Sequence, residues 1–234
     1  MEKILFDAHA HINEERFSEM DRNKIAKEIE KSQVAYVIDA AFDIRSSRQA
    51  ISDAEKYPWC YAIVGIHPHD SKELDENALS QLREMSRHPK VKGIGEIGLD
   101  FYYDRSERDV QRKGFRRQIR LANELKLPIV IHSRDADAET MEILREEGAF
   151  SSERQSFFPY RRDENGEKVP DSRVLIHCYS GSKEMAREYV KLGATISICG
   201  PVTFKNNRKT SEVAEDIPIE FLTVETDSPY LAPV

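Results

Sequence analysis

The sequence predicts a (β/α)8 barrel of the TIM type from three observations. Eight short apolar runs recur along the 234 residues, and segments with helical spacing separate most of them. Runs such as Ile129-Val130-Ile131 are continuously apolar, which is typical of parallel strands buried on both faces. Residue types that bind metals follow five of the runs, and closing the sheet would bring the first and last of these ends together. The alternation alone also fits an open, doubly wound sheet.

The eight expected strands are short and separated by helical segments. In chain order they span residues 4–11, 35–41, 60–67, 91–99, 128–132, 173–177, 194–199 and 221–225. Between them, apolar residues recur three or four positions apart, as in Phe115, Ile119 and Ala122. This spacing places them on one face of a helix, so each such segment is expected to cross over the sheet and pack on its outside.

The composition indicates one globular domain over residues 1–234, because the chain is 39% hydrophobic and 33% charged. The formal charge of −7 argues against a broad basic surface that grips duplex nucleic acid. It does not exclude a nucleic-acid substrate, since bound divalent cations can invert the local field in a cleft.

The cysteines and the start of the chain predict a cytoplasmic protein with no membrane partner. Cys60, Cys178 and Cys199 are odd in number and widely spaced, so they indicate buried apolar side chains rather than a disulfide framework. The chain opens directly into a strand without a signal-peptide core. No apolar stretch reaches the roughly 18 residues of a spanning helix.

Two stretches depart from the regular pattern. Residues 148–172, between the fifth helix and the sixth strand, are too long for an ordinary connection and are expected on the barrel face opposite the active site. Their aromatic residues could cover the barrel bottom or touch a partner subunit, and disorder over residues 163–168 is an equal alternative. After the eighth strand, the chain as given leaves no room for a last outer helix.

The metal-binding residue types begin with a pair on the first strand. His9 and His11 point to the same side, because strand side chains alternate, and can therefore bind one cation together. Glu96 ends an apolar, glycine-rich strand where an unpaired charge would be costly, so a cation is its natural partner. Each residue alone also fits a structural role with ordinary hydrogen bonds.

Three further residues complete the set: His132, His177 and Asp227 follow the fifth, sixth and eighth strands. Four histidines and two carboxylates exceed what one tetrahedral zinc needs, so we expect two divalent ions, with Zn, Mn, Mg, Co and Fe all open. Glu96 is the expected bridging ligand. A metal pair about 3.5–4 Å apart activates water for hydrolysis, which predicts a metal-dependent hydrolase.

Six sequence blocks closely resemble those of TatD-type metal-dependent deoxyribonucleases, a family of the amidohydrolase-like superfamily. The resemblance runs from Asp7 to Pro233, and its blocks are Asp7-Ala8-His9-Ala10-His11, Gly65-Ile66-His67-Pro68, Gly95-Glu96-Ile97-Gly98-Leu99-Asp100, His132-Ser133-Arg134-Asp135-Ala136, His177-Cys178-Tyr179-Ser180-Gly181 and Glu225-Thr226-Asp227-Ser228-Pro229-Tyr230-Leu231-Ala232-Pro233. It implies a TIM barrel that hydrolyses phosphodiesters, often by cleaving DNA from the 3′ end. Family members usually continue past the last block through an Arg- and Asn-containing segment into a final helix, which this sequence lacks.

By the same resemblance, His9 and His11 would bind the first metal with Asp227, and Glu96 would bridge. His132 and His177 would then hold the second metal.

Physical arguments suggest further roles around the metals. Asp227 can act as general base or as a pure ligand. His67 and Arg134 are expected to contact phosphate, although Arg134 could instead pair with Asp135 or Asp100. Asp7 and Asp100 are expected to orient the ligating histidines. His69 and His88 lie outside the strand-end pattern and are expected at the surface.

The leading functional prediction is a deoxyribonuclease of the 3′-5′ exonuclease kind, with single-stranded DNA or DNA 3′ ends as substrate. The first alternative is an ester or amide hydrolase on the same metals, such as an aminoacyl-tRNA deacylase, because an activated hydroxide also attacks carbonyl carbon. The second is a catalytically impaired metal-binding protein. Monomer and homo-oligomer both remain open.

Overall fold

Eight parallel strands form one sheet in the order β1-β2-β3-β4-β5-β8-β9-β10 in the computed structural model, which describes residues 2–234. All eight predicted strands are confirmed, with ends that differ from the expected ones by a few residues. The strands are β1 (Leu5–Ala10), β2 (Val34–Ala40), β3 (Cys60–Val64), β4 (Val91–Asp100), β5 (Ile129–Arg134), β8 (Val174–Ile176), β9 (Thr195–Ile198) and β10 (Leu222–Val224).

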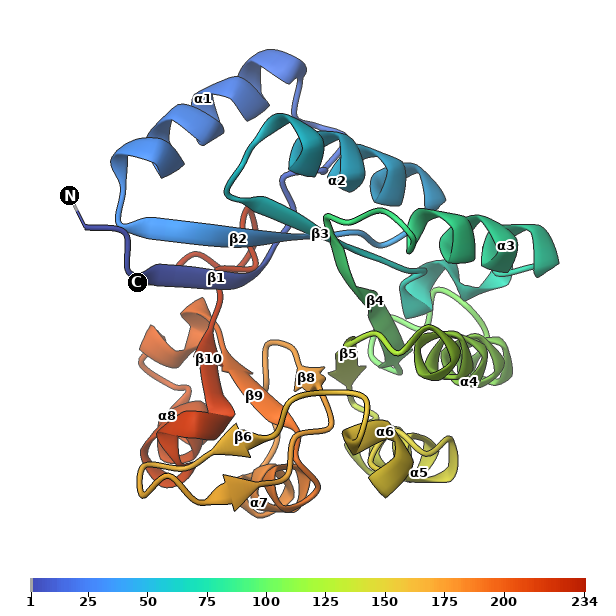
Figure 1. Cartoon of the computed structure of the whole chain (residues 1–234), viewed down its shortest axis with the longest axis vertical. Helices are drawn as coiled ribbons and strands as arrows, with labels where there is room; N and C mark the ends of the chain where they lie inside the picture. The colour runs from blue at the N-terminus through green and yellow to red at the C-terminus, as the bar shows by residue number, and fades with distance from the viewer. Residues whose placement is uncertain (1) are drawn as a thin grey trace.

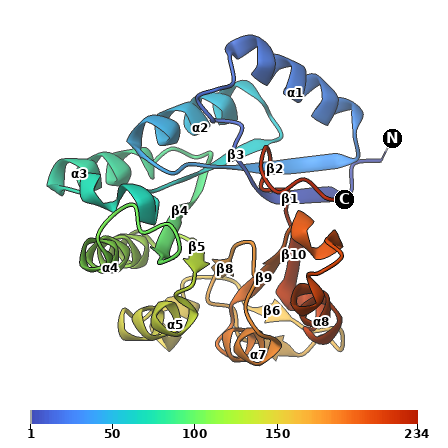
Figure 2. The same ribbon diagram turned by 180° about the vertical axis from the view of Figure 1, so that it is seen from behind.

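Helices surround the sheet on the outside and join successive strands, as Figures 1 and 2 show from opposite sides. They are α1 (Glu19–Lys31), α2 (Ile44–Lys56), α3 (Glu76–Met85), α4 (Arg108–Leu125), α5 (Asp137–Glu146), α7 (Lys183–Lys191) and α8 (Arg208–Asp216), with short 3-10 turns η1 (Pro68–Glu73), η2 (Gly200–Thr203) and η3 (Ile219–Phe221). The predicted (β/α)8 architecture is therefore confirmed. Among residues 2–234, no helix follows β10 and none is long and apolar enough to cross a membrane.

The barrel closes where the segment after β10 binds β1. The backbone N–H of Asp227 donates to the carbonyl of His9 at 2.9 Å, and the N–H of His11 donates to the carbonyl of Ser228 at 2.7 Å. Asp7 strengthens this seam, since its carboxylate accepts hydrogen bonds from the backbone N–H and the hydroxyl of Thr226. The closure therefore sets the last metal-binding residue type directly beside the first two.

Alternation along the strands divides the apolar side chains between two cores. Ile63 and Val130 pack with Ala40 in a small cluster drawn from strands alone, which is the barrel interior. Their neighbours Ala62, Val64, Ile129 and Ile131 face the other way, into the large core between strands and helices. A filled interior leaves the C-terminal rim of the strands as the place for chemistry.

Gly98 allows β4 and β5 to approach closely at the level of the site. It pairs with His132 in the strand register and has a φ of +149°. A Cβ atom on Gly98 would lie 1.9 Å from the carbonyl oxygen of His132, a separation that no side chain tolerates. The glycine is therefore needed to hold His132 near the residues of β4.

Residues 148–172 lie on the barrel face opposite the C-terminal strand ends, as predicted. They form α6 (Ser152–Gln155) and an antiparallel hairpin of β6 (Arg161–Arg162) and β7 (Lys168–Val169), which lies in front of the strands in Figure 1. The alternative of disorder over 163–168 is not what the structure shows. Arg161 donates to the hydroxyl of Thr195, at the start of β9, so the hairpin is tied to the N-terminal ends of the strands.

Arg154 anchors this segment from inside the protein. Its guanidinium is 1% exposed and donates to the carbonyls of Ser172 and Leu127 and to the side-chain oxygen of Asn123. None of these partners is a carboxylate, and burial lowers the pKa of Arg154 to about 10. Three neutral oxygens therefore satisfy the buried cation.

Replacing Arg154 by Ala should destabilise the protein by about 2–4 kcal/mol, because it leaves three buried acceptors without a donor and opens a cavity. Chemical denaturation followed by circular dichroism would measure this change. Arg162→Ala, at an exposed arginine of the same 148–172 segment, is the control and should cost less than about 0.5 kcal/mol. Equal effects of the two substitutions would contradict the anchoring role.

Candidate active site

All six predicted metal-binding side chains converge at the C-terminal rim of the barrel. His9, Glu96 and His132 belong to β1, β4 and β5, while His11, His177 and Asp227 lie shortly after the ends of β1, β8 and β10. Five of them are buried, with exposed fractions between 0% for His9 and 8% for Asp227. His132 is half-buried. The fold thus brings together residues that are up to 218 positions apart in the sequence.

One group of donor atoms lies around the first strand. Nε2 of His9 and Nε2 of His11 are 3.3 Å apart, and they lie 3.4 and 4.0 Å from Oε2 of Glu96. Oδ1 of Asp227 lies 3.2 Å from Nε2 of His11 and 3.8 Å from Nε2 of His9. Atoms of His9, His11 and Glu96 are close enough together to hold a metal ion.

A second group faces the other oxygen of the same carboxylate. Oε1 of Glu96 lies 2.7 Å from Nδ1 of His132, and 3.6 Å from Nε2 of both His67 and His177. Atoms of His67, Glu96 and His132 also lie close enough together to hold a metal ion. The two oxygens of Glu96 therefore face two different sets of nitrogens.

The hydrogen bonding of His11 indicates that a cation fits among the donor atoms of the first group. Nδ1 of His11 is 2.7 Å from the carbonyl oxygen of Ala40, which can only accept, so Nδ1 carries a proton. The neutral ring then directs the lone pair of Nε2 toward Oδ1 of Asp227, another acceptor. Two acceptors at this distance repel unless a proton or a cation lies between them, so the donor set fits a bound cation.

The buried carboxylates of the site have no basic side chain to balance them. Within residues 2–234, Glu96, Asp100, Glu225 and Asp227 form ion pairs only with histidines. Burial acts to raise the pKa of Glu96, but the charge of the neighbouring His177 and the contact with the His132 imidazole hold it well below its usual range. The carboxylates are thus negatively charged at neutral pH, which also favours a cation.

The pKa values of the histidines diverge with their surroundings. Burial lowers the pKa of His67 well below its usual value, and burial with the nearby His177 lowers that of His9. Burial also acts to lower the pKa of His177, but the carboxylates of Glu225 and Glu96 raise it to about 10. Neutral imidazole is the form that ligates metals, so the neutral His9 is ready to act as a ligand.

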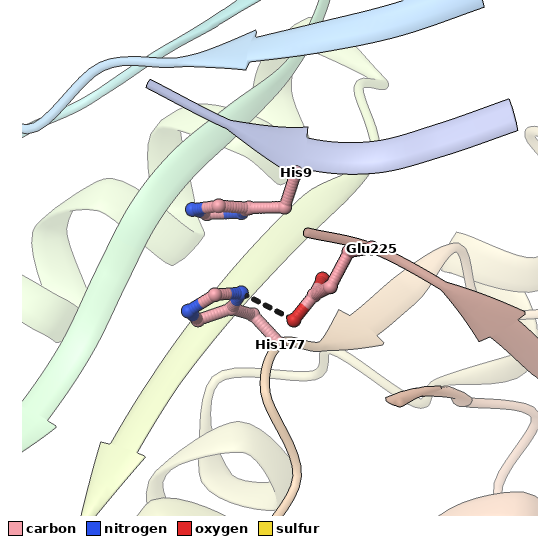
Figure 3. Close-up of side chains that lie close together, drawn as sticks. All are labelled: His9, His177 and Glu225. Carbon is pink, nitrogen blue, oxygen red and sulfur yellow. Dashed lines mark ion pairs between the residues drawn. The ribbon is translucent and has the colours of Figure 1, made fainter. Parts of the chain in front are cut away.

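Glu225 is a site residue that the sequence reasoning missed. Figure 3 shows the stacked rings of His9 and His177, with the Glu225 carboxylate beside Nδ1 of His177 at 2.8 Å. The N–H of that ring is not aligned for a hydrogen bond, so the contact is an ion pair. Glu225 also accepts from the backbone N–H of Cys178 and the hydroxyl of Ser197. Its position two residues before Asp227, at the end of a predicted strand, is the signal that could have found it.

Asp100 links two histidines at the edge of the site. Its Oδ2 lies 2.8 Å from Nε2 of His69 and 3.3 Å from Nε2 of His132, a contact of the kind expected from the sequence. The expectation that His69 is a surface residue was wrong, because η1 folds it back over Asp100 and leaves its side chain 17% exposed. His88, in contrast, pairs with Glu55 away from the other histidines.

Two other predicted residues make different contacts from those expected. Asp7 binds Thr226 and the backbone N–H of His9, so it contacts no ligating imidazole and instead holds the barrel seam. Arg134 is exposed at the end of β5 and, within the described residues, pairs with neither Asp135 nor Asp100. Its guanidinium instead lies over the rings of Tyr102 and Tyr103.

A family model described as TatD related DNase matches residues 6–234. The chain belongs to this family. An uncharacterized metal-dependent hydrolase, YabD of Bacillus subtilis, is 39% identical over 98% of the chain and 82% of its own length. The 3′-5′ ssDNA/RNA exonuclease TatD of Citrobacter koseri is 30% identical over 98% of the chain and 80% of its own length.

Solved structures agree with this membership. YJJV, a TatD homologue from Escherichia coli K12, has a TM-score of 0.81 and 26% identity over 98% of the chain and 81% of that structure. A TatD family hydrolase from Entamoeba histolytica, 23% identical with a TM-score of 0.80 over 99% of the chain and 76% of that structure, shares the fold. The protein is therefore a metal-dependent hydrolase of the TatD family, with histidine and glutamate clusters able to bind metal.

The pairing of His177 with Glu225 can be tested in the metal-free TatD-family protein. We expect His177 to stay protonated at about pH 8, whereas Glu225→Gln should lower its pKa by about one pH unit or more, since the main opposing charge is lost. Two-dimensional NMR of the imidazole nitrogens would follow the titration. The resonances of His88 should be the same in both proteins, and an unchanged His177 titration would contradict the pairing.

Proposed function

We propose that this protein uses two divalent cations to hydrolyse the phosphodiester bonds of single-stranded DNA, removing nucleotides from the 3′ end. The main support for this proposal is the position of Glu96, whose two oxygens face separate groups of histidine nitrogens. A carboxylate shared in this way suits a two-metal hydrolytic site, a class that includes nucleases and phosphatases. The similarity to a relative named as a 3′-5′ ssDNA/RNA exonuclease supports the same substrate class.

The residues divide between two cations. His9, His11 and Asp227 would hold the first, His132 with His177 would hold the second, and Glu96 would be shared between them. His177 would lose its ring proton on binding the cation, since only the neutral imidazole is a ligand. Nε2 of His177 lies 3.6 Å from Oε1 of Glu96 and 3.8 Å from Oδ1 of Asp227, so it faces both groups, and the proposal assigns it to the second. All of these donors are nitrogen or oxygen, so Zn, Mn, Co and Fe fit best, and Mg fits less well because it prefers oxygen ligands.

His67 is better suited to bind phosphate than metal. Its Nδ1 accepts a hydrogen bond from the backbone N–H of His69 at 3.2 Å, so in the neutral ring the proton belongs to Nε2. The lowered pKa of His67 keeps the ring neutral. An Nε2–H group beside Glu96 can donate to a phosphate oxygen, whereas it has no lone pair for a metal.

Asp227 is the proposed general base. When bound, divalent cations would polarise the phosphodiester and make the attacking water more acidic. Burial acts to raise the pKa of Asp227, but the contact with the His11 imidazole and the charge of the nearby His177 keep the pKa below its usual value, so the carboxylate is ionised and able to accept a proton. The water oxygen would bond to phosphorus as the 3′ oxygen of the preceding nucleotide leaves.

Cleavage of a 5′-labelled single-stranded oligodeoxynucleotide tests this function. We expect metal-dependent shortening from the 3′ end that stops with a chelator and falls by about 100-fold or more in Glu96→Ala and Asp227→Asn, since loss of a direct ligand exceeds the effect of losing a supporting residue. Glu84→Gln, an exposed carboxylate on α3, is the matched control and should retain full activity.

Activity of both site variants equal to that of the unchanged protein would contradict the site. The same protein should be assayed with RNA and with carboxylic esters, including aminoacyl-tRNA. Turnover of acyl substrates alone would instead favour the ester hydrolase alternative. Bound metal without turnover of any substrate would favour the impaired metal-binding protein.

A further inference from the structure

We propose that Tyr102, Tyr103 and Arg134 form a platform on which a nucleobase of the substrate stacks beside the cleavage site. The inference rests on the proposed function and adds a binding subsite for the base, whereas the metal residues act on the phosphodiester. Tyr102 and Tyr103 lie shortly after the end of β4 and are 59% and 49% exposed. Two neighbouring aromatic rings left open to water at an active-site rim indicate a surface that binds a ligand.

The geometry of the three side chains suits a flat aromatic ligand. The two tyrosine rings meet edge to face with centroids 4.9 Å apart. The guanidinium of Arg134 lies 4.2 Å from the ring centre of Tyr102 and 4.6 Å from that of Tyr103. Single-strand binding proteins combine aromatic rings for bases with arginines that contact phosphates, and stacking tolerates any base.

Asp100 connects this platform to the catalytic rim. One oxygen of Asp100 accepts hydrogen bonds from the backbone N–H groups of Tyr102 and Tyr103, at 3.0 and 2.8 Å. The other oxygen faces His69 and His132. The ring of His69 also meets that of Tyr103 edge to face at 5.5 Å. A base on the platform would therefore belong to a nucleotide close to the bond that is cleaved.

Positive charges at the platform favour the binding of a polyanion, although the protein as a whole is acidic. Arg134 and Arg105 form no ion pair within residues 2–234, and Arg105 lies 5.4 Å from the ring centre of Tyr103. Arg108, by contrast, is occupied by Asp104. Two unpaired guanidinium groups beside two exposed rings match the alternating phosphates and bases of a single strand, in which the bases are free to stack.

Tyr160 provides a matched control on the opposite face. It is 52% exposed, and Lys168 and Arg162 lie 4.0 and 4.9 Å from its ring centre. Its residue type, exposure and cationic neighbours thus resemble those of the platform. It belongs to the 148–172 segment at the barrel bottom, so the proposal gives it no role in substrate binding.

The first experiment measures binding of a fluorescein-labelled oligothymidylate by fluorescence anisotropy, using Glu96→Ala protein with metal so that the strand is not cleaved. Adding Tyr102→Ala and Tyr103→Ala together should weaken binding by about 5- to 150-fold, the range for loss of one stacked base. The pair Tyr102→Phe and Tyr103→Phe keeps the rings and should bind normally, as should Tyr160→Ala.

The second experiment identifies the base as the partner of the rings. The oligothymidylate is compared with a strand whose last three 3′ nucleotides lack bases. The unchanged platform should prefer the strand with bases, and the double Tyr→Ala protein should bind both strands equally. Cleavage by proteins with an intact Glu96 should show the loss mainly as a raised KM.

The outcomes separate this inference from the proposed function. If the platform variants bind as tightly as the parent while the unchanged protein still cleaves DNA, the platform is overturned and the nuclease function stands. If the Glu96→Ala parent does not bind nucleic acid and the unchanged protein does not cleave it, both fall. A normal base preference in the double Tyr→Ala protein would also overturn the platform, including the case in which these rings dock a protein partner instead.

Discussion

The organisation of this site depends on one electrostatic constraint: several carboxylates are buried and, within residues 2–234, no lysine or arginine neutralises them. Glu96 stands at the centre, with imidazoles on both sides of its carboxylate. Buried negative charge of this kind is costly unless protons or cations compensate it. The histidines gathered around Glu96 and the pairing of His177 with Glu225 follow from that constraint.

Closure of the barrel brings the buried carboxylates and the histidines together from the first and last strands. The hydrogen bond from Asp227 to the carbonyl of His9 joins the last strand end to the first, and the Asp7 carboxylate holds Thr226 across the same seam. The opposite face contributes to stability, since the buried Arg154 fixes the 148–172 segment there. Stability at the barrel bottom and chemistry at the top are thus assigned to separate residues, as is usual in this fold.

Much of this could be predicted from the sequence, because strand alternation and strand ends are local signals. His9 and His11 share one face of a strand, and His132 and His177 each stand at the end of an apolar run. The barrel fold is therefore enough to predict that these four side chains converge. Glu225 was missed because its partners come from β8 and β9, which only tertiary structure brings near. His69 was misplaced because the 3-10 turn η1, not a strand, returns it to Asp100. The hairpin in the 148–172 segment was not predicted because its strands are two residues each.

The central claim is that Glu96 bridges two cations, and diffraction from Mn²⁺-soaked crystals at the manganese absorption edge tests it most directly. The account predicts two anomalous peaks, one beside each oxygen of Glu96, with His9, His11 and Asp227 around the first and His132 and His177 around the second. A single peak, or two peaks of which neither contacts Glu96, would contradict it.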